Sequence, residues 1–397
     1  MAFALIASIF IIAQYFTLHF VNRGSNKIGI KDSTLHFDAI RRTVSVAQYI
    51  LAAFLLVAVF QMAVASHYYV VIISGITSVS FTLAFATMGI LAWRFFRWYR
   101  SKKDATVVLY GLSSATLAAK NTFMLGFMLP VLSSRPSEIG EHSSIYAYFA
   151  VGSIPYISSY GLDISTIISF ILMWITTVML LHHYSTSLGK AKYWVLICIP
   201  LLYFLSQFAI LYSGAFGSLL QINPTSISII VSIIFTMSLP IGGLLFGGAF
   251  FIIARRIPPG NIVKNYLALY GCGIMLFFIP GQVNLINSPY PPFGLVALSS
   301  IGLASYLILV GLYSSAISIS HDKKLRQSIR KFVRAKLLDN IALAQMEEEM
   351  NKEVVKLVKE NSEILGAQTG VYPSLSEEDI KHYLQTVLEE TKKVSHQ

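Results

Sequence analysis

The sequence has few charged residues and almost no cysteine. Of its 397 residues, 12% are charged and 55% are hydrophobic, and the mean hydropathy is +0.64. Because a soluble domain carries roughly 25% charged residues, this composition excludes an ordinary soluble domain and indicates a membrane protein. The two cysteines, Cys198 and Cys272, both lie inside apolar stretches. They are too few for a disulfide framework or for a metal site built on CxxC motifs.

The short motifs of common enzymes are also missing. The sequence contains no GxxxxGKS/T phosphate loop, no HExxH, no GxSxG and no glycine-rich dinucleotide fingerprint. His182 and His183 are adjacent, so their side chains diverge on a helix, and the remaining histidines form no convincing ligand set. We therefore expect neither an enzyme nor a metal site, and the sequence points to no particular cofactor.

What the sequence does contain is a series of long apolar stretches. Each has about the 20 residues that a helix needs to cross a bilayer. The stretches occupy residues 2–21, 43–64, 69–93, 106–132, 162–182, 193–215, 226–253, 265–286 and 294–318. The expected fold class is therefore all-α, a polytopic helical membrane protein with about nine transmembrane helices. The first stretch lacks a basic n-region and an A-x-A cleavage site, so we interpret it as a retained helix.

The distribution of charge predicts the orientation. Residues 1–318 hold 17 Lys and Arg against 6 Asp and Glu, whereas residues 319–397 hold 13 of each kind. Within residues 1–318 the basic residues cluster in alternate loops, and the opposite set of loops contains only Arg135. We expect the protein to lie in a cell membrane. By the positive-inside rule, its N-terminus is then outside and its C-terminus is in the cytoplasm. Basic loops between spans also argue against nucleic-acid binding.

Two domains follow from this pattern: a transmembrane helical domain, residues 1–318, and a cytoplasmic helical tail, residues 319–397. In the tail, apolar residues every four positions predict a long amphipathic helix; they are Leu325, Ile329, Val333, Leu337 and Ile341. A second apolar row follows, made of Met346, Met350, Val354, Leu357 and Ile364. The row shifts between the two halves, so a strict heptad does not run through, and a straight coiled coil is one option among several.

The first half of the tail is basic and the second half is more acidic, led by Glu347, Glu348 and Glu349. Each Lys or Arg near an anionic membrane surface contributes about 1 kcal/mol of attraction. The basic half therefore predicts contact with lipid headgroups or with a protein partner, including self-association through the tail. The residues assigned to this contact are Lys323, Lys324, Arg326, Arg330, Lys331 and Arg334. A solvated helical stalk without a partner is the alternative.

One cation lies near the middle of an apolar stretch. Lys120, followed by Asn121, falls within residues 106–132. A lysine at this depth costs at least ~2.5 kcal/mol on insertion scales, so it must face protein, water or a ligand. No carboxylate is expected at its depth, because Asp163 is placed near the outer end of its span. Lys120 is thus either a site for an anion or a proton-coupled step, or a lysine satisfied by nearby carbonyls and hydroxyls.

Two neighbouring spans are interrupted by proline and glycine. Such interruptions free backbone carbonyls that can line a binding site, or they serve close helix packing with a kink. With Lys120 and Asn121, the candidate ligand-binding residues are Pro240, Gly243, Pro280, Gln282 and Asn284. A shift of about 160 residues also lays 109–111 (Leu-Tyr-Gly) onto 269–271, which is a weak signal of an internal repeat.

The array of spans followed by the helix SISHDKKLRQSIRKFVRAKLLDNIALAQMEEEM resembles the multi-span sensory region of prokaryotic membrane receptors and sensor kinases. The resemblance implies a sensor or signalling-accessory protein that relays packing changes in the membrane domain to the tail. Such receptors continue into a kinase or methyl-accepting module, which this sequence does not contain. Two alternatives stay open. One is a transporter or channel for a small, anionic solute with Lys120 in the pathway, and the other is a structural membrane subunit of a larger complex.

Overall fold

The computed structural model describes residues 2–27, 37–101, 103–133, 138–139, 152–182, 189–212, 224–257, 261–279, 292–329 and 336–369. Nearly all of these residues are helical. The helices are α1 (Ala2–Lys27), α2 (Phe37–Ala65), α3 (Val70–Ser101), α4 (Ala105–Ser133), α5 (Ile154–Leu181), α7 (Lys190–Tyr212), α9 (Pro224–Arg256), α10 (Ile262–Phe278), α12 (Phe293–His321), α13 (Lys323–Ser328) and α14 (Lys336–Thr369). Two short strands, β1 (Tyr68–Tyr69) and β2 (Glu138–Ile139), form one antiparallel pair.

Eight of these helices are long and apolar enough to cross a membrane: α1, α2, α3, α4, α5, α7, α9 and α12. This confirms a helical, multi-pass membrane fold. The remaining expected span, 265–286, overlaps α10, whose 17 residues end at Phe278. Its last part, 280–286, lies outside the described residues. The short β1–β2 pair, which the sequence analysis did not anticipate, joins the turn after α2 to the segment after α4.

The observed helices differ from the apolar stretches at two functionally important ends. The stretch predicted as 69–93 continues as α3 to Ser101, because a helix does not need apolar residues where it leaves the hydrocarbon. The stretch predicted to begin at 162 belongs to α5, which begins at Ile154 with Pro155 in its first turn. Both differences change the depth at which particular charged side chains lie.

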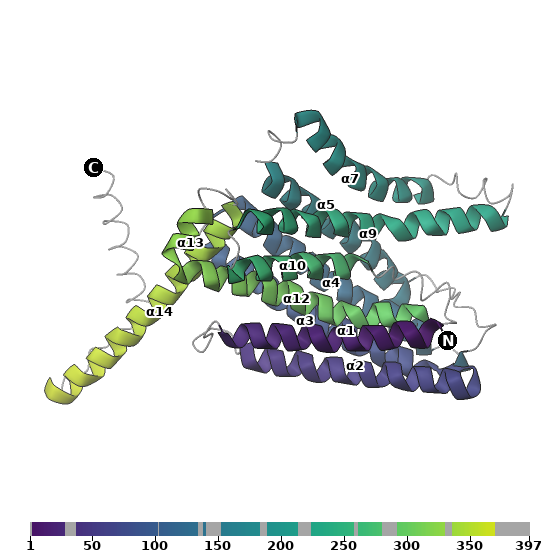
Figure 1. The fold of residues 1–397 in the computed structure, drawn as a ribbon, viewed down its shortest axis with the longest axis horizontal. Coiled ribbons are helices and arrows are strands. Elements are labelled where there is room, and N and C mark those ends of the chain that lie inside the picture. Colours follow the sequence, from purple (N-terminus) through teal and green to yellow (C-terminus); the bar gives the residue numbers. More distant parts are fainter. Residues whose placement is uncertain are drawn as a thin grey trace.

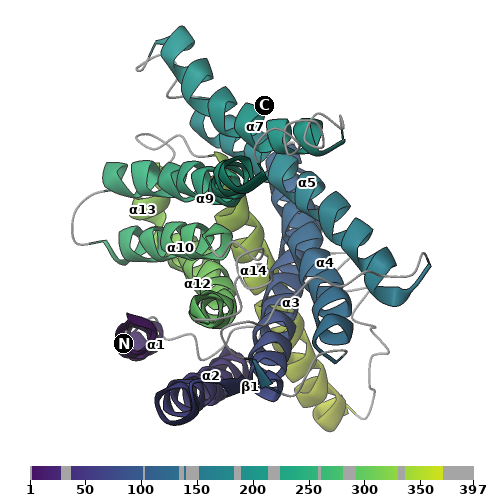
Figure 2. The same ribbon diagram turned by 90° about the vertical axis from the view of Figure 1, so that its right-hand side faces the viewer.

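The helix α12 forms the centre of the bundle. In its most apolar window 89% of the residues are buried, compared with 22% in α1 and 28% in α2. It packs against α1, α2, α3, α10 and α14, as Figure 2 shows in the view along the bundle. The peripheral helices instead expose large apolar side chains, such as Phe16 and Phe60, on the outside of the bundle. An apolar exterior of this kind suits contact with lipid.

Glycines bring α9, α10 and α12 close together. A Cβ atom added to Gly247 of α9 would collide with the Gly271 carbonyl of α10, and the reverse substitution would also collide. A Cβ atom on Gly311 of α12 would lie 2.6 Å from the Tyr270 amide nitrogen. Small residues at such contacts allow the backbones of transmembrane helices to approach closely. These three helices therefore form one tightly packed block.

Two helical hairpins in the bundle share a set of contacts. In the α3–α4 hairpin, Gly111 lies against the ring of Phe96, and in the α9–α10 hairpin, Gly271 lies against the ring of Phe251. The matching glycines are 160 residues apart, which is the shift suggested by the sequence. The phenylalanines are 155 residues apart, so the two contacts do not follow a single shift, and the internal repeat stays a prediction.

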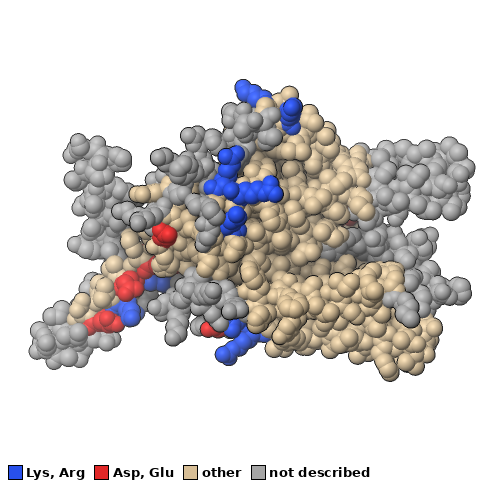
Figure 3. All heavy atoms as spheres, in the orientation of Figure 1, with Lys and Arg blue, Asp and Glu red and all other residues tan. Residues whose placement is uncertain are grey.

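Basic side chains of the described residues gather toward one end of the bundle, which we call the basic end (Figure 3). They come from the ends of α3 and α9 and from the starts of α4, α7 and α10; the residues are Arg97, Arg100, Lys103, Lys190, Lys192, Arg255, Arg256 and Lys264. The helix α14 begins at this end and then runs obliquely away from the bundle (Figure 1).

Candidate functional site at the basic end of the bundle

The first three turns of α14 dock on the bundle through apolar side chains. Leu337, Leu338 and Ile341 are each 1% exposed, and Ala342 is fully buried. The helix contacts α12, α3 and α4. Fully burying a leucine or isoleucine side chain contributes about 1.5–3 kcal/mol, so these residues provide the main attraction between α14 and the bundle. The polar contacts described next fix its position.

Glu348 of α14 lies at the centre of a group of three cations. Its carboxylate oxygens are 3.3 Å from Nη1 of Arg94, and Nη1 of Arg97 lies 3.3 Å from Oε1. The ammonium of Lys352, one turn further along α14, is also 3.3 Å from Oε1. Burial lowers the pKa of the Lys352 ammonium and the two arginines lower it further, while Glu348 raises it. The positive charge around Glu348 is thus in excess.

Arg94 is the residue that links three helices. Its side chain is 0% exposed, although it carries a full positive charge. Besides the contact with Glu348, its Nη2 donates to the hydroxyl of Tyr313 on α12 at 3.2 Å. The guanidinium also lies 5.1 Å from the centre of the Tyr313 ring and 5.3 Å from that of Trp93. A buried guanidinium needs such compensation, because an unpaired buried charge is strongly unfavourable.

An aromatic stack supports this arrangement. Tyr313 stacks on Phe37 of α2 at 5.7 Å and on Trp98 of α3 at 6.4 Å between ring centres. The indole Nε1 of Trp98 donates to Oε1 of Gln345 on α14 at 3.1 Å. Because Trp98 and Gln345 are both buried, the stack and the hydrogen bond place α14 relative to α2, α3 and α12.

The two glutamates beside Glu348 bind different helices. The hydroxyl of Ser101, the last residue of α3, donates to Oε2 of Glu347 at 2.6 Å. Glu349 accepts from Nε2 of Gln345 at 2.8 Å, and its other oxygen lies 3.6 Å from Nε2 of His321, the last residue of α12. Three consecutive carboxylates thus connect α14 to the ends of α3 and α12. We call this set of contacts the junction.

The predicted cation Lys120 is buried in α4 and only 4% exposed. Its ammonium makes no hydrogen bond or ion pair with any residue that the structure describes. The hydroxyl of Thr116 donates to the Ser113 carbonyl at 2.9 Å rather than meeting the lysine. The neighbouring Asn121 donates from Nδ2 to the Leu117 carbonyl at 2.9 Å, and its Oδ1 has no partner in the described part of the chain.

The expectation that Asp163 lies far from the depth of Lys120 is wrong. In the antiparallel α4–α5 pair, Gly126 lies against Ser158 and Gly161 against Phe123, a register that places Asp163 opposite residue 121. The reason is that α5 begins eight residues earlier than its apolar stretch, so Asp163 lies well inside the helix. The Asp163 side chain is exposed and forms no ion pair with Lys120.

The described residues of the predicted ligand set lie in two different helices. Lys120 and Asn121 are neighbours in α4, while Pro240 and Gly243 lie in α9. A Cβ atom on Gly243 would lie 2.6 Å from Cβ of Phe278, so in this conformation Gly243 serves close packing with α10. The remaining residues of the set, Pro280, Gln282 and Asn284, lie outside the described residues.

Of the basic tail residues, Arg326 contacts Sδ of Met346 on α14 through its guanidinium. Its partner is therefore another part of the tail. Lys323 and Lys324 begin α13, but their side chains are not among those described. The other three predicted contact residues, Arg330, Lys331 and Arg334, lie outside the described residues.

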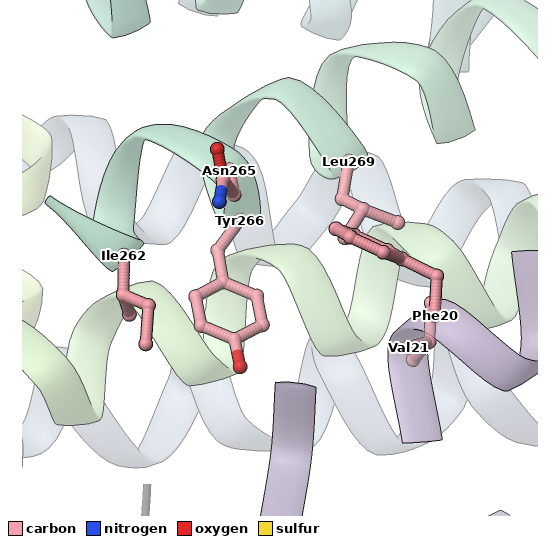
Figure 4. Close-up of a pocket in the computed structure, with 6 residues that line it drawn as sticks. All are labelled: Phe20, Val21, Ile262, Asn265, Tyr266 and Leu269. Carbon is pink, nitrogen blue, oxygen red and sulfur yellow. The ribbon is translucent and has the colours of Figure 1, made fainter. Parts of the chain in front are cut away.

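A shallow groove opens between α1 and α10 on the outside of the bundle (Figure 4). Its volume is about 40 Å³, and it is lined by Phe20, Val21, Ile262, Asn265, Tyr266 and Leu269. The lining is apolar apart from one amide and one hydroxyl, so it suits a hydrocarbon chain better than a charged solute. In the described part of the chain, no three His, Cys, Asp or Glu side chains are placed to hold a metal ion.

The sequence alone does not predict the junction. Arg94 and Arg97 belong to one of the basic loops from which the orientation is predicted. One signal was present: the segment WRFFRW places Arg94 and Trp98 four residues apart, on one face of a helix. Their partners lie about 250 residues further along the chain, a distance over which a single sequence gives no pairing information.

The contacts of the junction hold α14 against the ends of α3 and α12, so a movement of either end displaces α14. Removing Glu348 would leave Arg94 buried without its carboxylate. This geometry can therefore couple the position of α14 to the positions of the ends of α3 and α12.

In comparisons with known proteins, the chain matches no protein-family model, no curated protein and no solved structure.

Proposed function

We propose that the protein is a sensor or signalling-accessory protein of the cell membrane that relays changes in helix packing to its tail. By the positive-inside rule, the basic end faces the cytoplasm and the N-terminus lies outside, with α10 as the eighth of nine spans. The single observation that carries the proposal is the fully buried Arg94, which contacts Glu348 of the tail and Tyr313 of the central helix at once.

The relay runs through α12 and α3. A ligand or a change in the membrane alters the packing of the outer helices against α12, and the ends of α12 and α3 then move relative to each other. Because Glu349 contacts His321 on α12 and Glu347 contacts Ser101 on α3, that movement reorients α14. A stimulus reorients α14 only to the extent that it stabilises one arrangement of the packed helices more than the other.

The relay can be tested by measuring a distance across the junction. In a variant without Cys198 and Cys272, spin labels at Lys103 on the bundle and Lys359 on α14 report the position of the tail by pulsed electron resonance. We expect the distance to change when the protein is moved from short-chain to long-chain phosphatidylcholine bilayers, and the change to disappear in Glu348→Gln. The proposal fails if the distance is the same in all bilayers, or if Glu348→Gln responds like the parent.

Glu360→Gln provides the matched control. Glu360 lies on the same helix and pairs with Lys356 at 3.9 Å, but both side chains are more than half exposed. An exposed pair contributes about 0–1 kcal/mol, so this variant should respond to the bilayer like the parent.

A second candidate function is transport of a small anionic solute, favoured by the buried ammonium of Lys120 without a described partner. In the cysteine-free variant, Lys120→Cys should react with membrane-impermeant thiol reagents if it lines a water-filled pathway. Leu112→Cys, on the exposed side of the same helix, is the control that should not react. Labelling of position 120 alone would favour transport. If position 120 resists reagents from both sides in a folded protein, the pathway hypothesis is excluded there.

A further inference from the structure

Two rows of side chains occupy nearly opposite faces of α14. The first row faces the bundle; it comprises Leu338, Ile341, Gln345, Glu348 and Lys352. The second row is apolar apart from one asparagine; it comprises Met350, Val354, Leu357, Asn361 and Ile364. At about 3.6 residues per turn, positions 345 and 354 lie half a turn apart around the axis. The shift between the two apolar rows of the sequence therefore marks the point at which the apolar face of α14 turns from the bundle toward a different partner.

Two of the large apolar side chains in the second row are exposed. Met350 is 44% exposed and Leu357 is 50% exposed. The junction holds the opposite face of α14 against the bundle, and beyond it the helix runs away from the other helices (Figure 1). A row of large apolar residues on a helix in water requires a partner, because leaving it exposed gives up about 1.5–3 kcal/mol per large side chain.

The spacing of the second row identifies the kind of partner. Its residues follow one another at intervals of four, three, four and three, which is the heptad pattern of a coiled coil. Val354 and Asn361 occupy the a positions, and Met350, Leu357 and Ile364 occupy the d positions. A β-branched residue at a with Leu at d favours two parallel strands, and a single Asn at a specifies register and a two-stranded state.

The flanking positions are compatible with an identical helix. In a parallel pair, the g positions of one strand face the e positions of the other. Here the g positions are Glu353 and Glu360, and the e positions are Val358 and Leu365. No like charges meet across such an interface. An antiparallel pair would instead place the g glutamates of the two strands opposite each other, which is unfavourable.

Membrane topology is compatible with the same direction. Two copies in one membrane have the same orientation, and α14 leaves the basic end of each copy in the same sense. Their second rows therefore begin at equal distance from the bundle, as an in-register parallel pair requires. The row extends from Met350 to Ile364, and α14 continues to Thr369, so 20 residues or roughly 30 Å of helix follow from Met350 onward.

We infer that residues 350–369 form a parallel, two-stranded coiled coil with the same segment of a second copy of this chain. The inference rests on the proposed function only in that both require α14 to be docked at the junction with its second row facing outward. It names the partner of the tail, and it makes the signalling unit a dimer in which two bundles meet through α14.

The test is site-directed cross-linking of the full chain in bilayers. In the cysteine-free variant, Met350→Cys and Leu357→Cys should each form a disulfide-linked dimer on mild oxidation, as expected when identical d positions face each other. Lys359→Cys is the matched control, since this exposed residue lies two positions from Leu357 on the side of the helix that continues the docking face. We expect at least a tenfold slower cross-linking at position 359. Equal rates at 357 and 359 would indicate random encounter and overturn the inference.

Two further results test the direction of pairing and the oligomeric state. Cross-linking at only one of positions 350 and 357 would contradict a parallel, in-register pair. Native mass spectrometry of the purified chain should give twice the 44.0 kDa mass for the parent and the single mass for Leu357→Glu. A parent that is a monomer, or that binds only a different protein, overturns the inference.

The two proposals fail separately. The distance between labels at Lys103 and Lys359 reports docking within one copy, whereas the disulfides report contact between copies. If Leu357→Glu abolishes the dimer but keeps the intramolecular distance, the coiled coil is supported independently of the relay. If Glu348→Gln changes that distance while the parent shows no dimer, the junction stands and the coiled coil is wrong.

Discussion

Arg94 is more deeply buried than Glu348, the carboxylate that it contacts on α14. The arginine side chain is 0% exposed, whereas Glu348 is 12% exposed and also contacts Arg97 and Lys352. Coulomb attraction between unit charges about 4 Å apart is ~4 kcal/mol at an effective dielectric constant of 20. That attraction offsets the desolvation of the guanidinium only while the carboxylate is present.

This asymmetry predicts the order of three substitutions. Glu348→Gln should destabilise the docking of α14 by about 3–5 kcal/mol, because it leaves the Arg94 charge buried without its carboxylate. Arg94→Met should cost less, since Glu348 keeps Arg97 and Lys352 as partners. The double variant Arg94→Met with Glu348→Met should recover most of the loss, because apolar residues of similar volume often replace a buried pair without penalty.

Hydrogen exchange of the amides in the first turns of α14 measures these differences, since local opening sets their protection. Protection should fall most in Glu348→Gln, less in Arg94→Met and least in the double variant. Glu360→Gln serves as the control and should match the parent. An exchange rate in the double variant as fast as in Glu348→Gln would show that the ion pair does not act through the buried charge.

At the scale of elements, apolar periodicity predicted the helices well and their ends poorly. The stretch that ends at Trp93 belongs to a helix that continues to Ser101, and this extension carries Arg94, Arg97 and Trp98. Hydropathy measures transfer into hydrocarbon, so it stops where charged residues begin, although Arg is a good helix former. The α3 residues of the junction lie on this extension, so a search for apolar spans does not find them.

The tail illustrates a second limit. Its apolar spacing predicts one long helix, whereas the described residues form two, α13 and α14, and residues 330–335 lie outside the described part. The shift between the two apolar rows is visible in the sequence. In the sequence, the run of three glutamates marks only the more acidic half of the tail. In the structure each glutamate has a partner on the bundle or on α14, which only the three-dimensional arrangement of α3 and α12 provides. The predicted role of Lys120 stays a prediction, since its burial is compatible with both interpretations.

The second helices of the two hairpins, α4 and α10, begin with similar N-terminal caps. Oδ1 of Asp104 accepts from the Thr106 amide at the start of α4, and Oδ1 of Asn261 accepts from the Val263 amide at the start of α10. Each cap contributes about 0.5–2 kcal/mol to its helix. The two capping residues are 157 positions apart and the glycines 160, so the caps are similar but do not follow the shift that relates the glycines.

The close packing of α10 against α12 predicts the effect of a single methyl group. In Gly311→Ala, the new Cβ atom would lie 2.6 Å from the Tyr270 nitrogen and 2.7 Å from the Tyr266 oxygen, so the helices must separate. We expect a loss of about 1–3 kcal/mol in the stability of the bundle, the usual range for overpacking. Thermal unfolding in detergent measures it. Gly248→Ala is the control, since a Cβ atom there meets nothing within 4 Å and the midpoint should stay the same or rise, because Ala favours a helix over Gly by about 1 kcal/mol.

At the scale of the whole molecule, two forces compete to place the tail: docking on the bundle and attraction of its basic half to anionic lipid. The attraction of each surface Lys or Arg to anionic lipid is about 1 kcal/mol and falls off over the Debye length. That length shrinks from ~8 Å in physiological salt to ~3 Å in 1 M salt. Docking depends instead on buried apolar side chains and on a fully buried arginine, which salt screens little.

Salt therefore distinguishes the two forces. In the parent, the distance between labels at Lys103 and Lys359 should be the same at physiological salt and at 1 M salt, and the same in anionic and in neutral bilayers. In Glu348→Gln, docking is weakened, so attraction to lipid should become decisive and the distance should depend on both salt and lipid charge. A parent whose tail moves when salt is raised would mean that headgroups, rather than the junction, position α14. The relay would then have to run through the membrane surface instead of through Arg94.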